Sequence, residues 1–463
     1  MKARIPIAVP VLLLVASAGC SSAPNSQDST SDPDSAVELK VQNPTESALH
    51  RGEWPVVPWH EPFPWQGNHG GRPEVDAGKP STTDHDAGSD EDASTERDAA
   101  TGHDAAVGHD AATGHDAAAG HDAGSSSHGS DAGTISSSSG LHVVGNQIIG
   151  TSGSAITLHG VNRSGSEFAC VGGYGFFDGP TDQASITAIK SWGVNAVRVP
   201  LNEDCWLGIN GVVSTYAGAN YQQAITTYVD LLLANGVYPI LDLHWNAPGT
   251  ELATGQEPMA DSDHAPAFWT SVADAFKSEG SVIFELYNEP WPGNNEDTTA
   301  AWTCWRDGGT CASISYPVAG MQTLVTTVRA TGAANLVLLG GIEYSNALSQ
   351  WMTFKPTDPL NNLAAAWHVY EGNLCSTASC FNDIAAPVAA AFPIVATEIG
   401  DSSCDGAFLT TVMEWLDSKG QSYSPWTWNT WGTSCGEYSL ITDYTGTPNG
   451  AYGTAYQSHL QGL

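Results

Sequence analysis

Val282–Pro290, with the sequence VIFELYNEP, is the stretch of the chain that decides its fold. An apolar run of this length, rich in bulky residues, is typical of a strand buried on both faces of a parallel sheet. Polar groups follow directly on the run, because it ends in Asn288-Glu289-Pro290. In barrels of parallel strands, functional side chains sit at the carboxyl ends of the strands. The segment therefore predicts a parallel α/β architecture with Glu289 at its functional end.

Seven further segments have the same strand character, and helical periodicity separates most of them. The expected strands are Ile156–Gly160, Ala196–Pro200, Tyr238–His244, Leu336–Gly340, Ala365–Tyr370, Ile394–Ile399 and Tyr423–Asn429. The expected helices are Asp182–Trp192, Tyr221–Asn235, Ala265–Lys277, Val318–Thr331, Asp383–Ala391 and Ala407–Lys419. Eight buried strands with crossovers predict a (β/α)8 TIM barrel. The alternative, a doubly wound open sheet, would carry a Gly-rich turn after its first strand, and the sequence has none there.

The segment before the barrel divides into two parts. Leu141–Gly160 alternates apolar residues around Gly and Asn, which predicts a short N-terminal β-hairpin leading into the first strand. In residues 21–140, Ser, Asp, Gly, Ala and Pro dominate, and a six-residue GHDAAx unit repeats from Gly102 to Asp122. Such a segment buries too little apolar surface to offset the entropy of ordering it. We therefore expect a disordered low-complexity tether over 21–140 and one folded domain over 141–463.

The first residues have the layout of an export signal. Two early cations precede the apolar run Ile5–Ala16, and small residues lead up to Cys20. The run is too short to span a bilayer as a mature helix. We expect residues 1–20 to be a lipoprotein-type signal with a lipid anchor on Cys20, although Ser17 stands where Leu is usual; the alternative is an ordinary export signal. Ser21 lacks the acidic inner-membrane retention signal, so the expected location is the outer membrane or cell surface, otherwise secretion.

Eight cysteines remain besides Cys20, and an exported chain meets oxidising conditions, so disulfides are expected. Cys304–Cys311 and Cys375–Cys380 are locally closable pairs. Cys170 and Cys205 follow the first two predicted strands, and Cys404 and Cys435 follow the last two, so we expect Cys170–Cys205 and Cys404–Cys435 to bridge adjacent loops. No Cys-x-x-Cys or Cys/His spacing indicates zinc.

The formal net charge of −35 argues against a nucleic-acid partner, because binding phosphates needs clustered cations. The charge is instead typical of a soluble exported protein.

Two glutamates stand at the ends of predicted strands, Glu289 after the fourth and Glu398 after the seventh. Across a barrel mouth they could face one another, which is the arrangement that glycoside hydrolysis needs. One carboxyl must be protonated to assist the leaving sugar, and the other must be ionised to attack the anomeric carbon. Arg198, on the second predicted strand, is placed to favour the charged carboxylate.

The strand ends together resemble a known family. The segments LHGVN (158–162), VRVP (197–200), LDLHW (241–245), LYNEP (286–290), WHVY (367–370), ATEIG (396–400) and WTW (426–428) resemble glycoside hydrolase family 5. More specifically they look like its bacterial endoglucanase-type branches. The resemblance covers the chain from about Leu141 to Leu463, in the family's order.

The resemblance implies a role for each matched residue. Glu289 matches the acid/base and Glu398 the nucleophile of a retaining reaction that passes through a glycosyl-enzyme. A tryptophan of the eighth strand would stack on the sugar, and we favour Trp428 over Trp426. The remaining matches would bind the cleaved sugar or support the nucleophile: Arg198, His244, Asn288, His368 and Tyr370. Among the other tryptophans, Trp245 and Trp431 are the best candidates for sugar contacts at the rim.

The expected function is that of a retaining endo-β-1,4-glucanase, a cellulase, acting as a monomer on β-linked polysaccharide. Two-carboxylate chemistry requires neither a metal nor an organic cofactor, so none is expected. The family also hosts enzymes for mannan, glucomannan, xyloglucan and lichenan, and fold does not decide among them. A catalytically silent glycan-binding surface protein is the alternative from another class, and the presence of both glutamates counts against it.

Overall fold

The computed structural model describes residues 140–432, 435 and 438–463. The signal peptide, the Cys20 anchor and nearly all of the tether that the sequence predicts lie outside these residues. Within them the predicted TIM barrel is confirmed: eight parallel strands form one sheet. In chain order they are β4 (Gly160–Asn162), β5 (Ala196–Asn202), β6 (Tyr238–Trp245), β7 (Ile283–Glu285), β10 (Val337–Gly340), β11 (Leu363–Tyr370), β12 (Ile394–Gly400) and β13 (Ser422–Tyr423).

The sheet closes on itself between its first and last strands. Each barrel strand pairs with the next one along the chain, in the order β4 to β13. A parallel bridge between His159 and Tyr423 joins the two edges, and the amide of Tyr423 donates to the carbonyl of Leu158 over 2.9 Å. A side chain at Gly160 would collide with Ser424, so the closure needs glycine there. Closure brings all the carboxyl ends of the strands to one rim.

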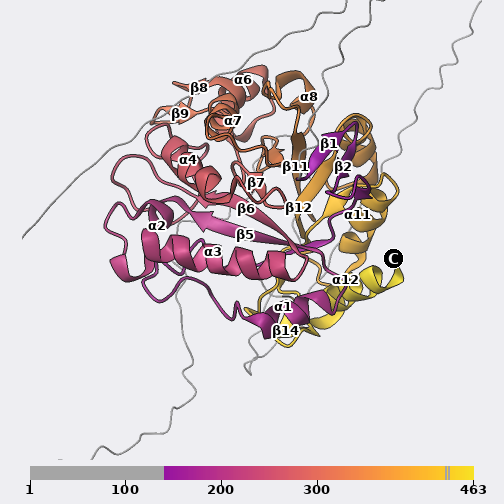
Figure 1. Ribbon diagram of the computed structural model, residues 1–463. Helices are drawn as coiled ribbons and strands as arrows, with labels where there is room; N and C mark the ends of the chain where they lie inside the picture. The colour runs from indigo at the N-terminus through magenta and orange to yellow at the C-terminus, as the bar shows by residue number, and fades with distance from the viewer. Residues whose placement is uncertain (1–139, 433–434, 436–437) are drawn as a thin grey trace, which may run out of the picture. The chain divides into compact units, whose positions relative to one another are not determined.

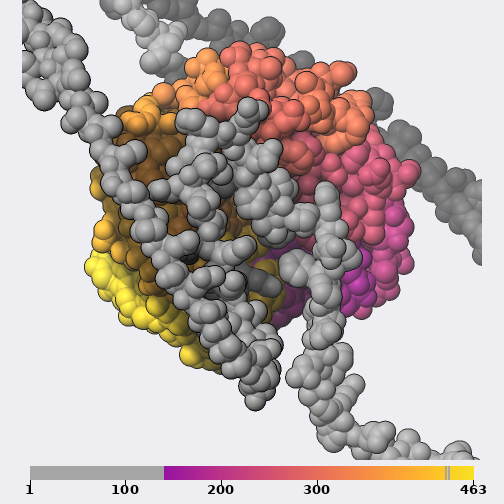
Figure 2. Space-filling model, turned by 180° about the vertical axis from the view of Figure 1, so that it is seen from behind, coloured from indigo at the N-terminus to yellow at the C-terminus, as the bar shows by residue number. Residues whose placement is uncertain are grey.

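Helices surround the strands, as Figure 1 shows, and most expected helices are present within one to three residues at either end. The longer helices are α1 (Gln183–Lys190), α3 (Ala219–Ala234), α4 (Ala265–Phe276), α6 (Thr299–Asp307), α7 (Met321–Ala330), α11 (Ala407–Asp417) and α12 (Gly450–Gly462). The short ones are α2 (Glu203–Leu207), η1 (Ser214–Tyr216), α5 (Pro292–Asn295), α8 (Trp351–Phe354), α9 (Ala378–Cys380), η2 (Phe381–Ala385) and α10 (Ala386–Ala389). Seen from behind in Figure 2, the colours progress from magenta through orange to yellow around the molecule, because successive units follow one another around the barrel axis.

A small antiparallel sheet lies beside the amino ends of the barrel strands. It consists of β1 (His142–Val144), β2 (Gln147–Ile149) and β3 (Ala155–Ile156). Leu141 and Ile148 pack with inward-facing strand residues such as Ile240 and Leu338 in one apolar cluster. This end of the barrel is therefore filled with side chains, and the opposite rim is left for polar groups. Two further two-stranded sheets are β8 (Gly308–Gly309) with β9 (Val318–Ala319), and β14 (Ile441–Asp443) with β15 (Thr447–Pro448).

The first and eighth strands differ from the sequence prediction. Ile156 belongs to β3, where it pairs with Ile148, so the first barrel strand begins only at Gly160. The last strand is confined to Ser422–Tyr423. Beyond it the backbone turns away from regular pairing, since the amide of Trp428 donates to the carbonyl of Asn162 over 2.8 Å. Side-chain alternation therefore does not hold through the WTW segment.

All four expected disulfides are present. Cys170–Cys205 and Cys404–Cys435 bridge neighbouring loops on the rim, and Cys304–Cys311 and Cys375–Cys380 close short loops. Among the described helices, none is both long and apolar enough to cross a lipid bilayer.

Candidate active site

Arg198, on β5, is the centre of the polar cluster at the carboxyl ends of the strands. Its side chain is fully buried and its nitrogens make five short contacts to side-chain oxygens, one for each N–H donor. Two of these are hydrogen bonds to glutamates: Nη1 donates to Oε1 of Glu398 over 2.6 Å, and Nε donates to Oε2 of Glu285 over 2.7 Å. Burial by itself would lower the pKa of Arg198, but the surrounding carboxylates outweigh it and raise the pKa. Arg198 is therefore a fixed positive charge against Glu398.

The other three contacts of Arg198 come from neighbouring strands. Nη1 donates to Oδ1 of Asn162 over 3.0 Å, and Nη2 donates to Oδ1 of Asn288 over 2.7 Å. Nη2 also lies 2.9 Å from Oδ2 of Asp242. Because these partners stand at the ends of β4 and β7 and on β6, one guanidinium fixes residues from strands far apart in the sequence.

Glu398, on β12, has both carboxylate oxygens engaged. Arg198 donates to Oε1, and the hydroxyl of Tyr370 donates to Oε2 over 2.6 Å. The side chain is 5% exposed, so one approach to it remains open. A charged, hydrogen-bonded carboxylate held in one orientation has the properties of a nucleophile.

Glu289 follows β7 and is the more open of the two glutamates, with a side chain 19% exposed. Its Oε1 lies 2.9 Å from Nδ1 of His368, and its Oε2 accepts a hydrogen bond of 2.8 Å from the amide of Gln256. Burial would raise the pKa of Glu289, but the hydrogen bond and positive charge of His368 outweigh burial and lower it. The lowered pKa of Glu289 favours a carboxylate paired with the imidazole of His368.

His368, on β11, stands between the two glutamates. Its Nδ1 lies 3.6 Å from Oε2 of Glu398, in addition to its contact with Glu289. Its Nε2 lies 3.1 Å from the hydroxyl of Thr397, which donates to Glu285 over 2.8 Å. Burial opposes protonation, but the charge of Glu398 and the contacts with Glu285 and Glu289 raise the pKa of His368 to about 10.

The two glutamates are close neighbours. A carboxylate oxygen of Glu289 and one of Glu398 lie within 4.8 Å of each other, and His368 Nδ1 lies within the same distance of both. Two carboxyl groups this close can act on the same bond of a bound sugar.

The aromatic residue at the site is Trp426, and the preference for Trp428 is wrong. Trp428 is fully buried and packs edge-on against Trp192, with 4.8 Å between ring centroids, so it has no face to offer a sugar. Trp426 is partly exposed and stacks on His244 at 5.6 Å with ring planes 10° apart. Nδ1 of His244 lies 2.7 Å from Oδ2 of Asp242, which fixes the imidazole beneath Trp426. On a regular strand both tryptophans would share one face, so alternation could not choose between them; the backbone leaves the strand after Tyr423, and only Trp426 stays at the site.

Trp245 and Trp431, the two rim tryptophans singled out from the sequence, both pack against Phe168. The ring centroids are 6.3 Å and 5.7 Å from that of Phe168, and both tryptophans are partly exposed. By contrast, Trp206, Trp302 and Trp351 are core residues.

Several members of the cluster were not singled out from the sequence. Asp242, Asn162 and Glu285 lie within or next to the quoted strand segments, so their strand-end positions were a usable signal. Gln256 was not predictable in this way, because it lies in the long segment between β6 and α4. Its side-chain oxygen Oε1 also accepts a hydrogen bond of 2.6 Å from the side-chain amide of Asn288. No sequence pattern places that segment over the site.

A testable consequence concerns the pH dependence of stability. The pKa of His368, about 10, lies above the ordinary value of about 6.5, so protonation stabilises the fold. That stabilisation is complete below pH 6.5 and is lost as the pH rises toward 10. We expect the free energy of unfolding of His368→Gln, measured by denaturant titration at several pH values, to fall less steeply over this window than that of the wild type. His142→Gln, outside the cluster, serves as control; equal slopes for His368→Gln and wild type would refute the assignment.

The comparisons with known proteins agree with this geometry. The family model "Cellulase (glycosyl hydrolase family 5)" matches residues 152–433. An endoglucanase of Clostridium saccharobutylicum is 24% identical over 312 residues, which are 65% of this chain and 60% of that protein. An endoglucanase of Microbulbifer is 27% identical over 150 residues, or 32% of this chain and 26% of that protein. The chain thus spans less than two thirds of the length of these relatives.

Solved structures share the fold at low sequence identity. A β-glucanase of Saccharophagus degradans in complex with cellotetraose has a TM-score of 0.54 at 19% identity, covering 70% of this chain and 93% of that one. The catalytic domain of a mannanase from Streptomyces has a TM-score of 0.51 at 21% identity, covering 73% of this chain and 95% of that one. Because the family model matches more than half of the chain, over the residues that build the barrel and its polar rim, the protein belongs to glycosyl hydrolase family 5.

Proposed function

We propose that the protein is a retaining endo-β-1,4-glucanase with Glu398 as nucleophile and Glu289 as acid/base. The observation that carries the proposal is the pair of glutamate oxygens within 4.8 Å of each other, with different partners on each carboxylate. Such proximity favours the retaining arrangement, in which the carboxyl groups stand about 5–5.5 Å apart, over the inverting one at about 6.5–9.5 Å. Glu398, held by Arg198 and Tyr370, is suited to attack; Glu289, held by His368, is suited to exchange a proton.

In the first step an oxygen of Glu398 attacks the anomeric carbon of the bound sugar while the glycosidic bond to the leaving sugar breaks. Glu289 gives its proton to the departing oxygen, so the leaving sugar departs as an alcohol. The product is an ester between the sugar and Glu398. Because Tyr370 and Arg198 fix the two oxygens of Glu398, the attacking lone pair is oriented before the substrate arrives.

The proton for this step comes from the pair of His368 and Glu289. Transfer along the 2.9 Å contact from Nδ1 to Oε1 converts imidazolium and carboxylate into neutral imidazole and carboxylic acid. A bound sugar that displaces water from the carboxylate favours this neutral form. In the second step Glu289 takes a proton from water, the water oxygen attacks the anomeric carbon, and Glu398 is released. The pair then holds its starting number of protons.

The β-1,4-glucan assignment draws on the relatives. Both curated relatives are named endoglucanases, and one structural neighbour was solved with cellotetraose. The partly exposed aromatic faces of Trp426, Trp245 and Trp431 suit the apolar faces of consecutive glucose rings. The mannanase among the structural neighbours makes mannan the second candidate polymer.

The cellular setting belongs to the same proposal. A lipid-anchored exported enzyme on a long low-complexity tether could reach insoluble polymer outside the cell, and the Cys20 motif and residues 21–140 support that reading. We propose that the enzyme acts as a monomer, since the cluster around Arg198 draws all its residues from one chain.

The first test is reducing-end release on carboxymethyl cellulose, mixed-linkage β-glucan, glucomannan, galactomannan, xyloglucan and xylan. We expect activity on the first two, no activity in Glu398→Gln, and a rate about 10²–10⁴-fold lower in Glu289→Gln, because each variant keeps the shape but loses the reacting group. Glu279→Gln, an exposed acid, is the control. Activity on a mannan alone would leave the proposed mechanism in place and change the assigned substrate. If the folded protein has no activity on any of the polymers, the proposal is refuted.

Substitutions of Trp426 and Trp428 test sugar binding and folding stability separately. Trp426→Ala should raise KM several-fold for oligosaccharides with little change in stability, because a stacking face worth about 0.5–1.5 kcal/mol is lost. Trp428→Ala should instead destabilise the fold by about 3–5 kcal/mol, because it leaves a cavity in the core. Thermal unfolding and KM measured on both variants check this. A raised KM in Trp428→Ala with unchanged stability would contradict it.

A further inference from the structure

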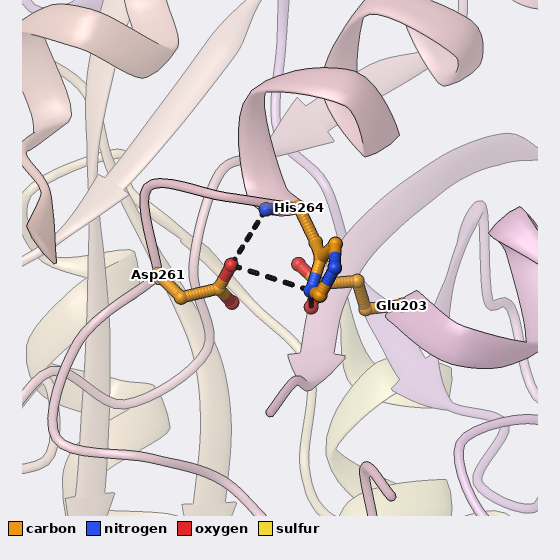
Figure 3. Close-up of side chains that lie close together, drawn as sticks. All are labelled: Glu203, Asp261 and His264. Atoms are coloured by element: carbon orange, nitrogen blue, oxygen red, sulfur yellow. Dashed lines mark hydrogen bonds and ion pairs between the residues drawn. The ribbon is translucent and has the colours of Figure 1, made fainter. Parts of the chain in front are cut away.

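A second cluster of ionisable side chains lies at the same rim and shares no residue with the cluster around Arg198. Glu203 is the first residue of α2, directly after β5. Asp261 lies in the segment between β6 and α4, and His264 is the N-cap of α4. Figure 3 shows the imidazole of His264 beside the carboxylate of Glu203, with the carboxylate of Asp261 facing both. Nothing in the proposed hydrolytic mechanism uses these three groups.

Glu203 is unusual among the buried groups of the protein. Its side chain is 0% exposed, and its polar neighbours include the carboxyl of Asp261 and the backbone of Ala247, although no donor reaches either carboxylate oxygen with good hydrogen-bond geometry among the described residues. In the described part of the chain, no Lys or Arg forms an ion pair with Glu203 or Asp261. A buried carboxylate left without a partner is costly, so a positive charge or a proton has to be supplied.

The geometry suits a single cation. Nδ1 of His264 lies 3.9 Å from Oε1 of Glu203 and 3.8 Å from Oδ1 of Asp261, and the ligand atoms of all three residues lie within 4.8 Å of one another. A point equidistant from three atoms so spaced is about 2.0–2.5 Å from each, which is the range of bonds to divalent cations. The side chain of His264 is 21% exposed, and Asp263 beside it is 46% exposed, so an ion has a route from solvent.

We propose that Glu203, Asp261 and His264 bind one divalent transition-metal ion of the Mn²⁺ or Zn²⁺ class. Two carboxylates and one imidazole form a mixed oxygen and nitrogen ligand set, which these ions accept. Ca²⁺ and Mg²⁺ prefer oxygen ligands alone, so the histidine counts against them. The remaining coordination positions are filled by water or by the adjacent Asp263, whose Oδ2 lies 4.0 Å from the imidazole.

The ion has a structural role, because the acids around it hold the segment between β6 and α4. Asn246 donates to Asp261 over 2.8 Å, and the amide of Gly249 donates to Asp263 over 2.8 Å. The same segment carries Gln256, which contacts both Glu289 and Asn288. An ion joining the start of α2 to this segment would hold Gln256 against the acid/base. This last consequence rests on the proposed function, whereas metal binding itself does not.

The alternative to a cation is a proton shared between the two carboxylates. Glu203→Gln distinguishes the two: an amide keeps the shape and can donate a hydrogen bond to Asp261, so it replaces a protonated Glu203 but not a metal ligand. Glu414→Gln, at an exposed acid on α11, is the matched control.

The experiment uses the full chain stripped with EDTA and then titrated separately with Mn²⁺, Zn²⁺ and Ca²⁺. Binding is followed by calorimetry, stability by thermal unfolding, and metal content by mass spectrometry. We expect one equivalent of Mn²⁺ or Zn²⁺ to bind and to raise Tm in the wild type and in Glu414→Gln. In Glu203→Gln the affinity should fall at least about tenfold and the rise in Tm should be lost.

Three results would overturn the proposal: no bound ion in the wild type, equal affinity in Glu203→Gln and wild type, or a response to Ca²⁺ alone. Because none of these readouts needs substrate, a failure here is separate from a failure of the hydrolytic proposal. If metal binding and the hydrolytic activity are both found, removing the ion should raise KM or lower kcat on β-glucan. Adding the ion back should restore the wild-type value.

Discussion

The rest of the site depends on the guanidinium of Arg198. It is buried at the open end of the barrel, and each of its N–H groups meets an oxygen from a different side chain. Those oxygens come from residues on or directly after β4, β6, β7 and β12, which only a closed barrel brings together. A buried cation of this kind is stable only while its partners stay in place; removing one partner of a buried pair costs about 3–5 kcal/mol. The fold and the site therefore depend on each other. Closure of the barrel brings the partners of Arg198 together, and Arg198 fixes the direction in which Glu398 points.

A second consequence is that the two neighbouring glutamates have different partners, which suits them to the opposite tasks that we propose. Glu398 accepts from Arg198 and Tyr370, so its negative charge is compensated where it stands. Glu289 instead contacts His368, whose raised pKa gives the pair a proton that can move over 2.9 Å. In the proposed mechanism, the division between attacking group and proton donor follows from these partners, since the two residues are chemically identical.

The sequence predicted the features that follow from strand ends. Buried apolar runs that end in polar residues located the barrel, and with it the two glutamates, Arg198 and His368, because the closing of a parallel barrel brings such ends together without further information. Strand logic could not decide between Trp426 and Trp428, since the chain leaves regular pairing after Tyr423 and Trp428 turns into the core against Trp192. Gln256 and the group of Glu203, Asp261 and His264 depend on the path of a long segment between β6 and α4. Its shape is set by tertiary contacts that no local periodicity encodes.

The central claim is that Glu398 forms a covalent bond to the sugar, and trapping that intermediate tests it most directly. A cello-oligosaccharide carrying fluorine at C2 and a good leaving group at C1 should transfer its glycosyl group to Glu398, with loss of the leaving group, faster than water can release the sugar. Mass spectrometry of the digested protein should then find one added glycosyl group, on the peptide that contains Glu398. Release of the leaving group without any gain in the mass of the protein would contradict the proposed mechanism. A glycosyl group attached to Glu289 would contradict it as well.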